Sequence, residues 1–493
     1  MPDVSFPSIH YVTVVPHLIV TGLAVVLLLM DAVSRRSRAV RVGQLASLIS
    51  VIGYGAALIS LLFTYTHRQT TGGGSIRYDY MAIFFLIVML STALLTVLVS
   101  ANFVQLQSMS LLEYLVILSF SVLGMMVVAI AGDLIMVFIG IELTSIAVYV
   151  LTGFSRQSRI SHEGALKYFL LGSFATGILI YGMAWTFGIT GSINLDVIAT
   201  AGAKIPTGNP SLLLALLLLV VGLGFKIAAV PFHMWTPDAY HGAPTPVTAF
   251  MSVGPKAAGF AGMLRVLVNG WTPAANQWVP LVIVLAVITM TFGNIVAVAQ
   301  NNVKRMLAYS SIAHTGYMLV GLASYQVGVN KADANGQAIG ALLFYTFAYA
   351  FTNIGAFSIL TWMQARGRGT NIESFRGLAS TAPGAAIAMT LFMASLMGVP
   401  PLLGFFAKYY IIVAAINANL TWLAVVVALN SAVSAYFYLR VVAVMYFREP
   451  DRQIVPQRTP WLGLGLAVSS FGTVLFGVFS GPVFDLARKV LLG

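Results

Sequence analysis

The sequence predicts an all-α integral membrane protein that crosses the bilayer about fourteen times. Of its 493 residues, 59% are hydrophobic and only 8% are charged, and the mean hydropathy is +0.91. Soluble proteins carry roughly 25% charged residues, so most of this apolar surface must face lipid. The apolar residues form runs of about 20, the length with which a helix crosses about 30 Å of hydrocarbon. Helices are expected because lipid offers no partner to unpaired backbone groups.

The predicted spans follow the apolar runs in chain order. They lie near residues 11–31, 43–65, 80–101, 111–130, 132–153, 164–188, 211–232, 243–268, 278–299, 303–323, 338–363, 384–415, 419–446 and 461–487. The longest connections, near 66–79, 189–210 and 324–337, are rich in Gly, Thr or Asn and are predicted to be loops. The whole chain, 1–493, is predicted to be one membrane domain.

Six lysines and arginines fall inside these spans, where a cation costs at least about 2.5 kcal/mol and is rare without a partner or a role. They are Lys167, Lys226, Lys256, Arg265, Lys408 and Arg440. Only one carboxylate, that of Glu142, is expected at a comparable depth. This combination is typical of a protein that moves protons or cations. Arg265 and Arg440 lie toward span ends, and their side chains are expected to extend to the interface.

Three spans carry prolines within eight residues of one of these lysines. They are Pro231 with Lys226 in span 7, Pro255 with Lys256 in span 8, and Pro400-Pro401 with Lys408 in span 12. A proline has no N–H, so the carbonyls of Ile227 and Met251, each four residues before a proline, lose their helical partners. In a membrane such carbonyls must be met by polar side chains, cations or water, which favours a hydrated polar interior.

Spans 7 and 12 are both predicted to be broken helices, and they are five spans apart. This spacing suggests two inverted five-helix repeats, spans 4–8 and spans 9–13, as in many transporters. The predicted organisation is a set of N-terminal helices 1–3 at residues 1–109, a first repeat at 110–268, a second repeat at 278–446 and a C-terminal helix at 461–493.

The loops on the two sides of the membrane differ in their content of Lys and Arg. Fourteen of the 26 basic residues fall in loops on one side, six fall on the other, and six are the intramembrane set. The fourteen are Arg35, Arg36, Arg38, Arg41, Arg156, Arg159, Lys304, Arg305, Arg366, Arg368, Arg376, Arg448, Arg452 and Arg458. Cytoplasmic loops carry the positive excess, so both chain ends are predicted to be non-cytoplasmic. The net charge of +12 is interpreted as loop charge, and no nucleic acid is expected as a partner.

The run from Pro231 to Arg265, PFHMWTPDAYHGAPTPVTAFMSVGPKAAGFAGMLR, carries the most specific signal in the chain. It resembles the signature of the antiporter-like membrane subunits of respiratory complex I, the NADH-quinone oxidoreductase, and is most similar to subunit N of that family. Three further motifs match the same family: IGIELTS at 139–145, LAYSSIAHTGYML at 307–319 and PPLLGFFAK at 400–408. The resemblance covers about residues 110–440, whereas the first three spans and the last carry little of it.

The resemblance implies a proton relay made of four residues, Glu142, Lys226, Lys256 and Lys408. It implies an ion pair between Glu142 and Lys226, a central lysine at Lys256, and a last ionisable residue at Lys408. Because some relatives have a carboxylate at this last place, the lysine again favours subunit N.

Four more residues match family positions that support such a relay. Lys167 matches a lysine between the ion pair and the central lysine, and His314 and Tyr309 fit the polar segment of span 10. Glu113 fits a family acid in span 4. An alternative for Glu113, and for Asp133, is a purely interfacial or packing role near the start of a span.

Elementary electrostatics explains how such a relay can work. Burial disfavours the charged form of a lysine, and a nearby carboxylate favours it. Lys226 should therefore hold its proton beside Glu142 and release it when the pair is broken. Lysine suits this role because its proton can be lost, whereas an arginine keeps its proton. The hypothesis is a relay through Lys226, Lys256 and Lys408, joined by water and by His or Tyr side chains.

Cofactor and metal sites are not expected in this chain. It has no cysteine, so disulfides and thiolate metal sites are excluded. His233 and His241 are eight residues apart, which is not the spacing of a zinc-binding helix. No Gly-rich nucleotide motif follows a strand. The resemblance therefore places flavin, iron–sulfur clusters and quinone in partner subunits.

The resemblance also implies partners and a location. The expected partners are a second antiporter-like subunit, small membrane subunits of complex I and the lipid bilayer, and the expected location is the bacterial plasma membrane. One alternative is a subunit of a multisubunit Na⁺/H⁺ antiporter or of a membrane-bound hydrogenase. Those relatives usually lack the Tyr-x-Gly-Ala-Pro-Thr-Pro form found at 240–246. A second alternative, an assembly subunit that transports nothing, is disfavoured because an unused buried charge is expensive.

Overall fold

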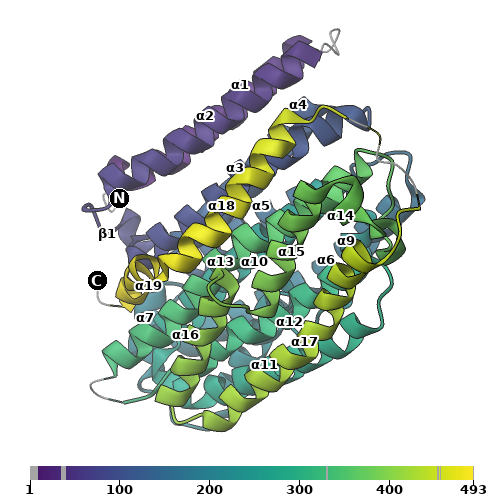
Figure 1. Cartoon of the computed structure of the whole chain (residues 1–493). Helices are drawn as coiled ribbons and strands as arrows, with labels where there is room; N and C mark the ends of the chain where they lie inside the picture. The colour runs from purple at the N-terminus through teal and green to yellow at the C-terminus, as the bar shows by residue number, and fades with distance from the viewer. Residues whose placement is uncertain (1–8, 35–39, 329–330, 452–454, 456, 492–493) are drawn as a thin grey trace.

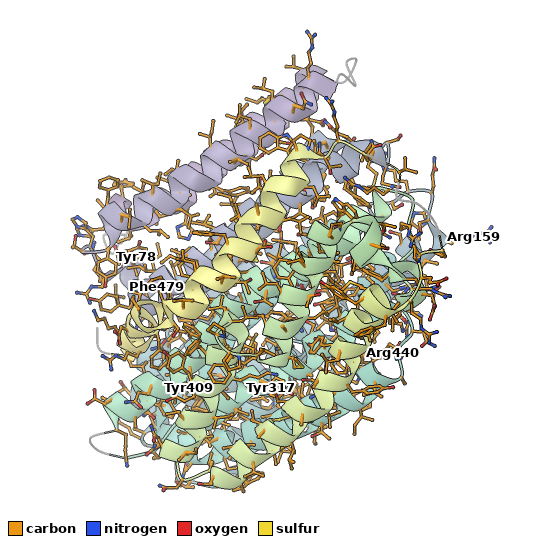
Figure 2. The ribbon with its side chains drawn as sticks, viewed as in Figure 1. Tyr78, Arg159, Tyr317, Tyr409, Arg440 and Phe479 are labelled. Atoms are coloured by element: carbon orange, nitrogen blue, oxygen red, sulfur yellow. The ribbon has the colours of Figure 1, made fainter. Side chains whose placement is uncertain are left out.

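The computed structural model describes residues 9–34, 40–328, 331–451, 455 and 457–491 (Figure 1). These residues form a bundle whose helices run between two ends. Arg159 and Arg440 lie toward one end of the bundle, and Tyr78 and Phe479 lie toward the other (Figure 2).

Three helices open the described chain, α1 (Tyr11–Ser34), α2 (Val40–Thr64) and α3 (Tyr80–Leu106). The connection before α3, predicted to be a loop, contains an antiparallel hairpin of β1 (Gln69–Thr71) and β2 (Ile76–Tyr78). Its turn is the 3-10 segment Gly72–Gly74, in which every glycine has a positive φ that other residues adopt only with strain. Ile76 also bridges to Ala131, which attaches the hairpin to the residues that follow α4.

The remaining helices fall into two groups and a C-terminal pair. The first group is α4 (Leu111–Ala129), α5 (Leu134–Thr152), α6 (Arg159–Thr190), α7 (Leu195–Gly202), α8 (Pro210–Lys226), α9 (Trp235–Gly242) and α10 (Thr245–Leu264), which a π-helical turn (Arg265–Gly270) continues. The second group is α11 (Ala275–Val298), α12 (Val303–Ala323), α13 (Ala332–Gln364), α14 (Leu378–Thr381), α15 (Pro383–Met397), α16 (Leu403–Asn417) and α17 (Thr421–Phe447). The pair is α18 (Pro460–Val478) and α19 (Ser480–Arg488), and short 3-10 segments lie at Thr272–Ala274, Ile372–Phe375 and Lys489–Leu491.

The connection 189–210, also predicted to be a loop, contains the short helix α7. Asn194 starts this helix because its side-chain oxygen accepts from the N–H groups of Asp196 and Val197. Asn194 also bridges to Asp133, the residue that caps α5. The two caps therefore attach the segment to the end of the bundle.

The described helices include ten that are long and apolar enough to cross a membrane: α1, α2, α3, α4, α5, α6, α11, α13, α17 and α18. Three shorter apolar helices, α8, α15 and α16, accompany them. Most of these coincide with the predicted spans. The all-helical membrane class is therefore confirmed apart from the small hairpin.

The centre of the bundle is formed by α10, α12 and α13. Every residue of α10 is buried, and the most apolar window of α13 is completely buried. By contrast, α6, α11 and α17 expose rows of large apolar side chains, as helices that face lipid do. Lys256 on α10 and His314 on α12 consequently lie in the protein interior and not at the lipid boundary.

The prolines act differently in the three spans that contain lysines. The seventh span ends its helix α8 at Lys226, and the chain re-enters a helix only at Trp235. The twelfth is split into α15 and α16 by residues 398–402, where Gly398 has a φ of 96°. In the eighth span, however, α10 continues through Pro255 without a break. The predicted breaks in spans 7 and 12 are thus present.

Candidate functional site

Glu142 on α5 and Lys226 at the end of α8 form the ion pair that the resemblance implied. Lys226 Nζ lies 3.1 Å from Glu142 Oε1, and it also donates to the hydroxyl of Ser145 at 3.0 Å. The Thr176 hydroxyl, from α6, donates to the same Glu142 oxygen at 2.7 Å. The Lys226 side chain is only 6% exposed, whereas that of Glu142 is 22% exposed. The pair therefore lies at the edge of the bundle with its acid on the outer side.

The Lys226 ammonium can occupy this place because its helix stops there. Pro231 cannot donate to the Ile227 carbonyl, and Ala228 adopts a φ of 60°, outside the helical region. The Thr315 hydroxyl from α12 donates to this carbonyl at 2.9 Å. The carbonyl freed by the proline is thus met by a polar side chain, as predicted.

Lys256 lies on α10 and reaches α12, where its partners are neutral. Its Nζ donates to the Ser311 carbonyl at 2.8 Å, to the Ser311 hydroxyl at 2.6 Å and to the Thr315 hydroxyl at 3.1 Å. Lys256 is 3% exposed, and no carboxylate among the described residues forms an ion pair with it. A charged lysine here is stabilised only by dipoles, so its proton is held weakly compared with that of a paired lysine.

Thr315 connects the broken end of α8 with Lys256. Its single hydroxyl donates to the Ile227 carbonyl, next to Lys226, and accepts from Lys256 Nζ. Thr315 therefore joins Lys256 Nζ to the backbone that follows Lys226, whereas the Lys226 ammonium itself contacts Glu142, Ser145 and Thr176. No pattern in the sequence points to this role of Thr315, since a threonine in an apolar helix is common.

The carbonyl that Pro255 frees also has a partner. The Tyr240 hydroxyl, from α9, donates to the Met251 carbonyl at 3.3 Å. In turn, the Thr248 hydroxyl donates to the Tyr240 carbonyl at 2.8 Å. This pair of bonds attaches the short helix α9 to the helix that carries Lys256.

Lys408 on α16 occupies the break of the twelfth span. Its Nζ donates to the Met397 carbonyl at 2.9 Å and to the Ser431 hydroxyl at 2.8 Å, and it lies 5.1 Å from the centre of the Tyr317 ring. Met397 is four residues before Pro401, so its carbonyl is freed by that proline. In all three spans, then, the freed carbonyl binds a hydroxyl group or an ammonium group.

His314 stands between Lys256 and Lys408 on α12. Its Nδ1 lies 2.7 Å from the Tyr345 hydroxyl and its Nε2 lies 3.0 Å from the Tyr438 hydroxyl, which also bonds Ser310. A hollow of about 10 Å³ adjoins His314 and is also lined by Tyr349, which is room for about one water molecule. The buried hydroxyl of Tyr349 has no hydrogen-bond partner within the described chain. The neighbourhood of His314 is therefore polar and not fully satisfied by protein groups.

Three of the predicted supporting residues lie apart from this row. Lys167 is 45% exposed on α6 and pairs with Glu163 at 2.6 Å and with Asp238 at 2.8 Å. Glu113 pairs with Arg156 at 2.7 Å at the start of α4, which is the interfacial role considered as its alternative. Tyr309 is partly buried and its carbonyl faces Gly293 of α11.

Asp238 also pairs with a second cation, Arg305 of α12. Arg305 lies 3.2 Å from the Asp238 oxygen that Lys167 does not contact, so Asp238 connects α6 with α12. Burial of the carboxyl group opposes ionisation, but the hydrogen bond and charge of Lys167, with Arg305, hold the pKa of Asp238 below its usual range. Lys304, expected as a solvated loop charge, is instead 4% exposed and donates to the carbonyls of His241 and Ala243. The polar groups around α9 therefore fasten it to α6 and α12.

Arg265 forms a buried ion pair that the sequence reasoning missed. Its side chain is 0% exposed, its Nη1 and Nη2 lie 2.6 and 2.8 Å from the two oxygens of Asp79, and its Nε and Nη2 donate to the Ala129 carbonyl. The Arg265 side chain is thus held in a buried ion pair and is not exposed at the interface, contrary to the expectation for this residue. Arg440, by contrast, reaches the connection between α11 and α12 through Asn301.

No group of three or more potential ligands suited to a metal ion occurs among the described residues. The site is a row of three amines with one carboxylate and several hydroxyls, and these groups can accept, hold and release protons.

Known proteins resemble this chain over nearly all of its length. The family model described as NADH:quinone oxidoreductase/Mrp antiporter, TM, matches residues 131–434. The NADH-quinone oxidoreductase subunit N 1 of Solibacter usitatus is 41% identical, with 96% of each chain covered. The subunit N of Trichlorobacter lovleyi is 42% identical over 99% of this chain and 98% of its own.

A solved structure supports the same relationship. A chain of respiratory complex I from Thermus thermophilus with bound aureothin superposes with a TM-score of 0.78 and is 32% identical, covering 96% of this chain and 99% of the other.

Proposed function

This chain belongs to the NADH:quinone oxidoreductase/Mrp antiporter family as a relative of subunit N, and from that membership we propose how it moves protons. It is an antiporter-like membrane subunit of the NADH:quinone oxidoreductase complex. The proposal is that protons pass through its buried row of Glu142, Lys226, Lys256 and Lys408, driven by quinone reduction in neighbouring subunits.

The observation that carries the proposal is the set of contacts along this row. Lys226 has a carboxylate partner, and Lys256 has only hydroxyl and carbonyl partners. Thr315 bonds both Lys256 Nζ and the carbonyl of Ile227, the residue that follows Lys226. A proton on Lys226 is stabilised while Glu142 stays at 3.1 Å, and it becomes easier to release when that distance grows. The distance between these two residues can therefore control the proton affinity of the next amine.

The contacts between Lys256 and Lys408 support a proton path that continues from Lys256 toward Lys408. Ser310 and Ser311 are adjacent on α12; Ser311 binds Lys256, and Ser310 reaches His314 through the Tyr438 hydroxyl. A neutral imidazole between two phenols can accept a proton on one nitrogen and donate from the other. His314 is therefore proposed as a supporting residue, while the contacts of Lys167, Glu113 and Tyr309 favour supporting roles outside the row.

We also propose fourteen spans. The ten long apolar helices become fourteen when α8, α10, α12 and the split pair α15–α16 are each taken as one crossing. The order α4, α5, α6, α8, α10 and the order α11, α12, α13, α15–α16, α17 each have their broken helix in fourth place, which supports two inverted repeats at 110–268 and 278–446. Residues 1–109 and 461–493 are then the N-terminal helices and the C-terminal helix.

The partners proposed are small membrane subunits and a second antiporter-like subunit. Glu142 lies in a row on α5 whose other members, Ile135, Ile139, Ile146 and Val150, are 49 to 59% exposed. A small membrane subunit that covers this row would contact the exposed side of Glu142, and its movement could change the ion-pair distance. This is where coupling to quinone reduction would enter the chain.

The proposed complex carries its redox centres elsewhere. Flavin, iron–sulfur clusters and quinone are proposed to lie in partner subunits, as membership of an NADH:quinone oxidoreductase complex implies. The proposed location is the bacterial plasma membrane with both chain ends on the non-cytoplasmic side. A Na⁺/H⁺ antiporter or hydrogenase subunit is not favoured, because the relatives that are 41% and 42% identical over nearly the whole chain are subunits N.

Lys226→Ala tests the proposal. Removal of the ammonium leaves Glu142 without its ion-pair partner and interrupts the row, so proton translocation through this chain should fall by about tenfold or more. The measurement is the number of protons moved per NADH oxidised by the assembled complex in vesicles. Lys204→Ala, at an exposed lysine beyond α7, is the control and should pump normally. Unchanged pumping by Lys226→Ala in a fully assembled complex would contradict the proposal.

Thr315→Val tests the link between Lys226 and Lys256. Valine keeps the volume but leaves the Ile227 carbonyl and Lys256 Nζ each without one partner. An unsatisfied buried polar group costs about 1–3 kcal/mol, so pumping is expected to slow by about fivefold or more. Thr315→Ser keeps the hydroxyl and should pump within about twofold of the wild type. Equal rates for the valine and serine variants would exclude the hydroxyl from the relay.

A further inference from the structure

A hollow of about 640 Å³ opens between the first helices and α18, far from the row of amines. One wall is the start of α2, with Arg41, Gln44, Leu45 and Leu48, and the other is the start of α18, including Trp461 and Leu464. The residues that line the hollow belong to the N-terminal parts of α2 and α18, two helices that Figure 1 labels. Its volume is in the range of about 300–1,000 Å³ that is typical of ligand pockets.

Both walls of the hollow are fixed on α3, so its width is set by the fold. The side-chain oxygen of Asn102 accepts from the N–H groups of Trp461 and Leu462, which fastens the start of α18 to α3. On the other side, a Cβ at Gly43 would collide with the side chain of Gln105, so α2 approaches α3 as closely as a glycine allows. Neither helix can slide across to close the space without losing these contacts.

The mouth of the hollow is cationic. Arg41 lines it, is exposed, and forms no ion pair within the described chain. Arg366 donates to the carbonyl of Gln457 at 2.6 Å and to the Thr459 hydroxyl, directly before the first residue of α18, and it likewise has no carboxylate partner among the described residues. The exposed Arg458 lies between those two acceptors in the chain. A ligand with a negative group would therefore be attracted to this end.

The walls behind the mouth are apolar. Leu45, Leu48 and Leu464 are 51, 45 and 50% exposed, and the same faces continue along both helices with Ile52 and Phe471 at 61 and 66%. Trp461, partly buried at the mouth, has the amphipathic ring that is enriched at membrane–water interfaces. The order of groups is thus arginine, tryptophan and then leucines, which matches the order of phosphate, glycerol and acyl chain in a phospholipid.

We infer that this hollow binds one anionic phospholipid, with its phosphate at Arg41 and an acyl chain between α2 and α18. A protein helix is a poorer occupant because it would leave Arg41 unpaired unless it also carried an acid at that level. A zwitterionic lipid is a poorer occupant because its ammonium group would meet the unpaired Arg41. The inference is independent of the proton relay, since no group of the row lines the hollow.

A photoreactive phospholipid tests the inference on the wild-type complex. The complex is placed in nanodiscs of phosphatidylcholine that contain a trace of phosphatidylglycerol with a diazirine in its acyl chain. Labelled peptides should come from α2 and α18, and added phosphatidylglycerol should compete for the label whereas added phosphatidylcholine should not. Labelling that both lipids reduce equally, or that misses these helices, would overturn the inference.

Variants separate the charge from the apolar walls. Arg41→Gln should lower the retention of phosphatidylglycerol at this site by about fivefold, the effect of one arginine near an anionic headgroup. Leu48→Trp should narrow the space between the apolar walls and lower the labelling of α2 and α18. Arg159→Gln removes an exposed arginine at the same end of the bundle and should change nothing. Retention equal to the wild type in both test variants, or cross-linking of a partner subunit into the hollow, would refute lipid binding.

Discussion

Replacing Lys256 by methionine is expected to slow proton transfer through this chain by about 100-fold. Methionine preserves the length and apolar stem of the side chain but removes the ammonium that contacts Ser311 and Thr315. A proton would then have to cross this part of the interior without an amine, at a cost of about 2.5–3.5 kcal/mol, which corresponds to about 100-fold in rate. The measurement is proton translocation per NADH oxidised by the assembled complex in sealed vesicles.

Two further variants distinguish a titrating lysine from one that only packs. Lys256→Arg keeps a positive charge, but an arginine does not release its proton, so this variant should be nearly as slow as Lys256→Met. Lys331→Met changes an exposed lysine before α13 and should behave as the wild type. If Lys256→Arg pumps normally, the charge alone matters and the relay as proposed is wrong.

Replacing Arg265 by methionine is expected to destabilise the protein by up to about 3–5 kcal/mol, because the largely buried carboxylate of Asp79 keeps only the partly exposed Arg77, at 3.3 Å, as a charged partner. Arg265 is 0% exposed and joins α10 to the start of α3 and to the Ala129 carbonyl after α4. The loss should appear as a lower midpoint of thermal unfolding in detergent and as less assembled complex in the membrane.

Matched variants define the origin of this loss. Asp79→Asn combined with Arg265→Met removes both charges, keeps a side-chain acceptor for the Ala82 N–H at the start of α3, and should recover much of the stability. Arg156→Ala breaks the exposed pair with Glu113 and should change the stability by less than about 1 kcal/mol. A double variant as unstable as Arg265→Met alone would show that the loss comes from packing and not from an unpaired charge.

The same ion pair predicts how stability depends on pH. Burial of the Asp79 carboxyl group opposes ionisation, but the charge and hydrogen bonds of Arg265, the Ala82 N–H and Arg77 hold the pKa of Asp79 below its ordinary value of 3.8. A carboxyl group whose pKa is lower in the folded state stabilises the fold fully above its unfolded pKa, and this contribution disappears as the pH falls through the folded pKa. The thermal midpoints of the wild type and the double variant should therefore converge in acid, below about pH 4.

The membrane class and most helix positions could be predicted from the sequence because they depend on local composition. An apolar run of about 20 residues has one stable form in lipid, so α5 at Leu134–Thr152 and α12 at Val303–Ala323 agree closely with the predicted spans 132–153 and 303–323. The helix breaks next to Lys226 and Lys408 could also be predicted from the local sequence, because a proline removes a specific backbone hydrogen bond. Where short polar segments depend on contacts with distant residues, as in α7 and the hairpin before α3, the prediction of a loop failed.

The sequence by itself determined which ionisable residues have apolar neighbours along the chain. It also determined which backbone carbonyls would lose their helical hydrogen bond to a proline. Only the tertiary structure decided their partners: Thr315 for the Ile227 carbonyl, Tyr240 for that of Met251, and Asp79 for a buried Arg265. Which polar groups become partners depends on how helices that are distant in the chain pack against one another. Asp79 and Arg265, for example, are 186 residues apart. Hydropathy reports only whether a residue prefers lipid to water, so it carries no information about which polar groups meet in the interior.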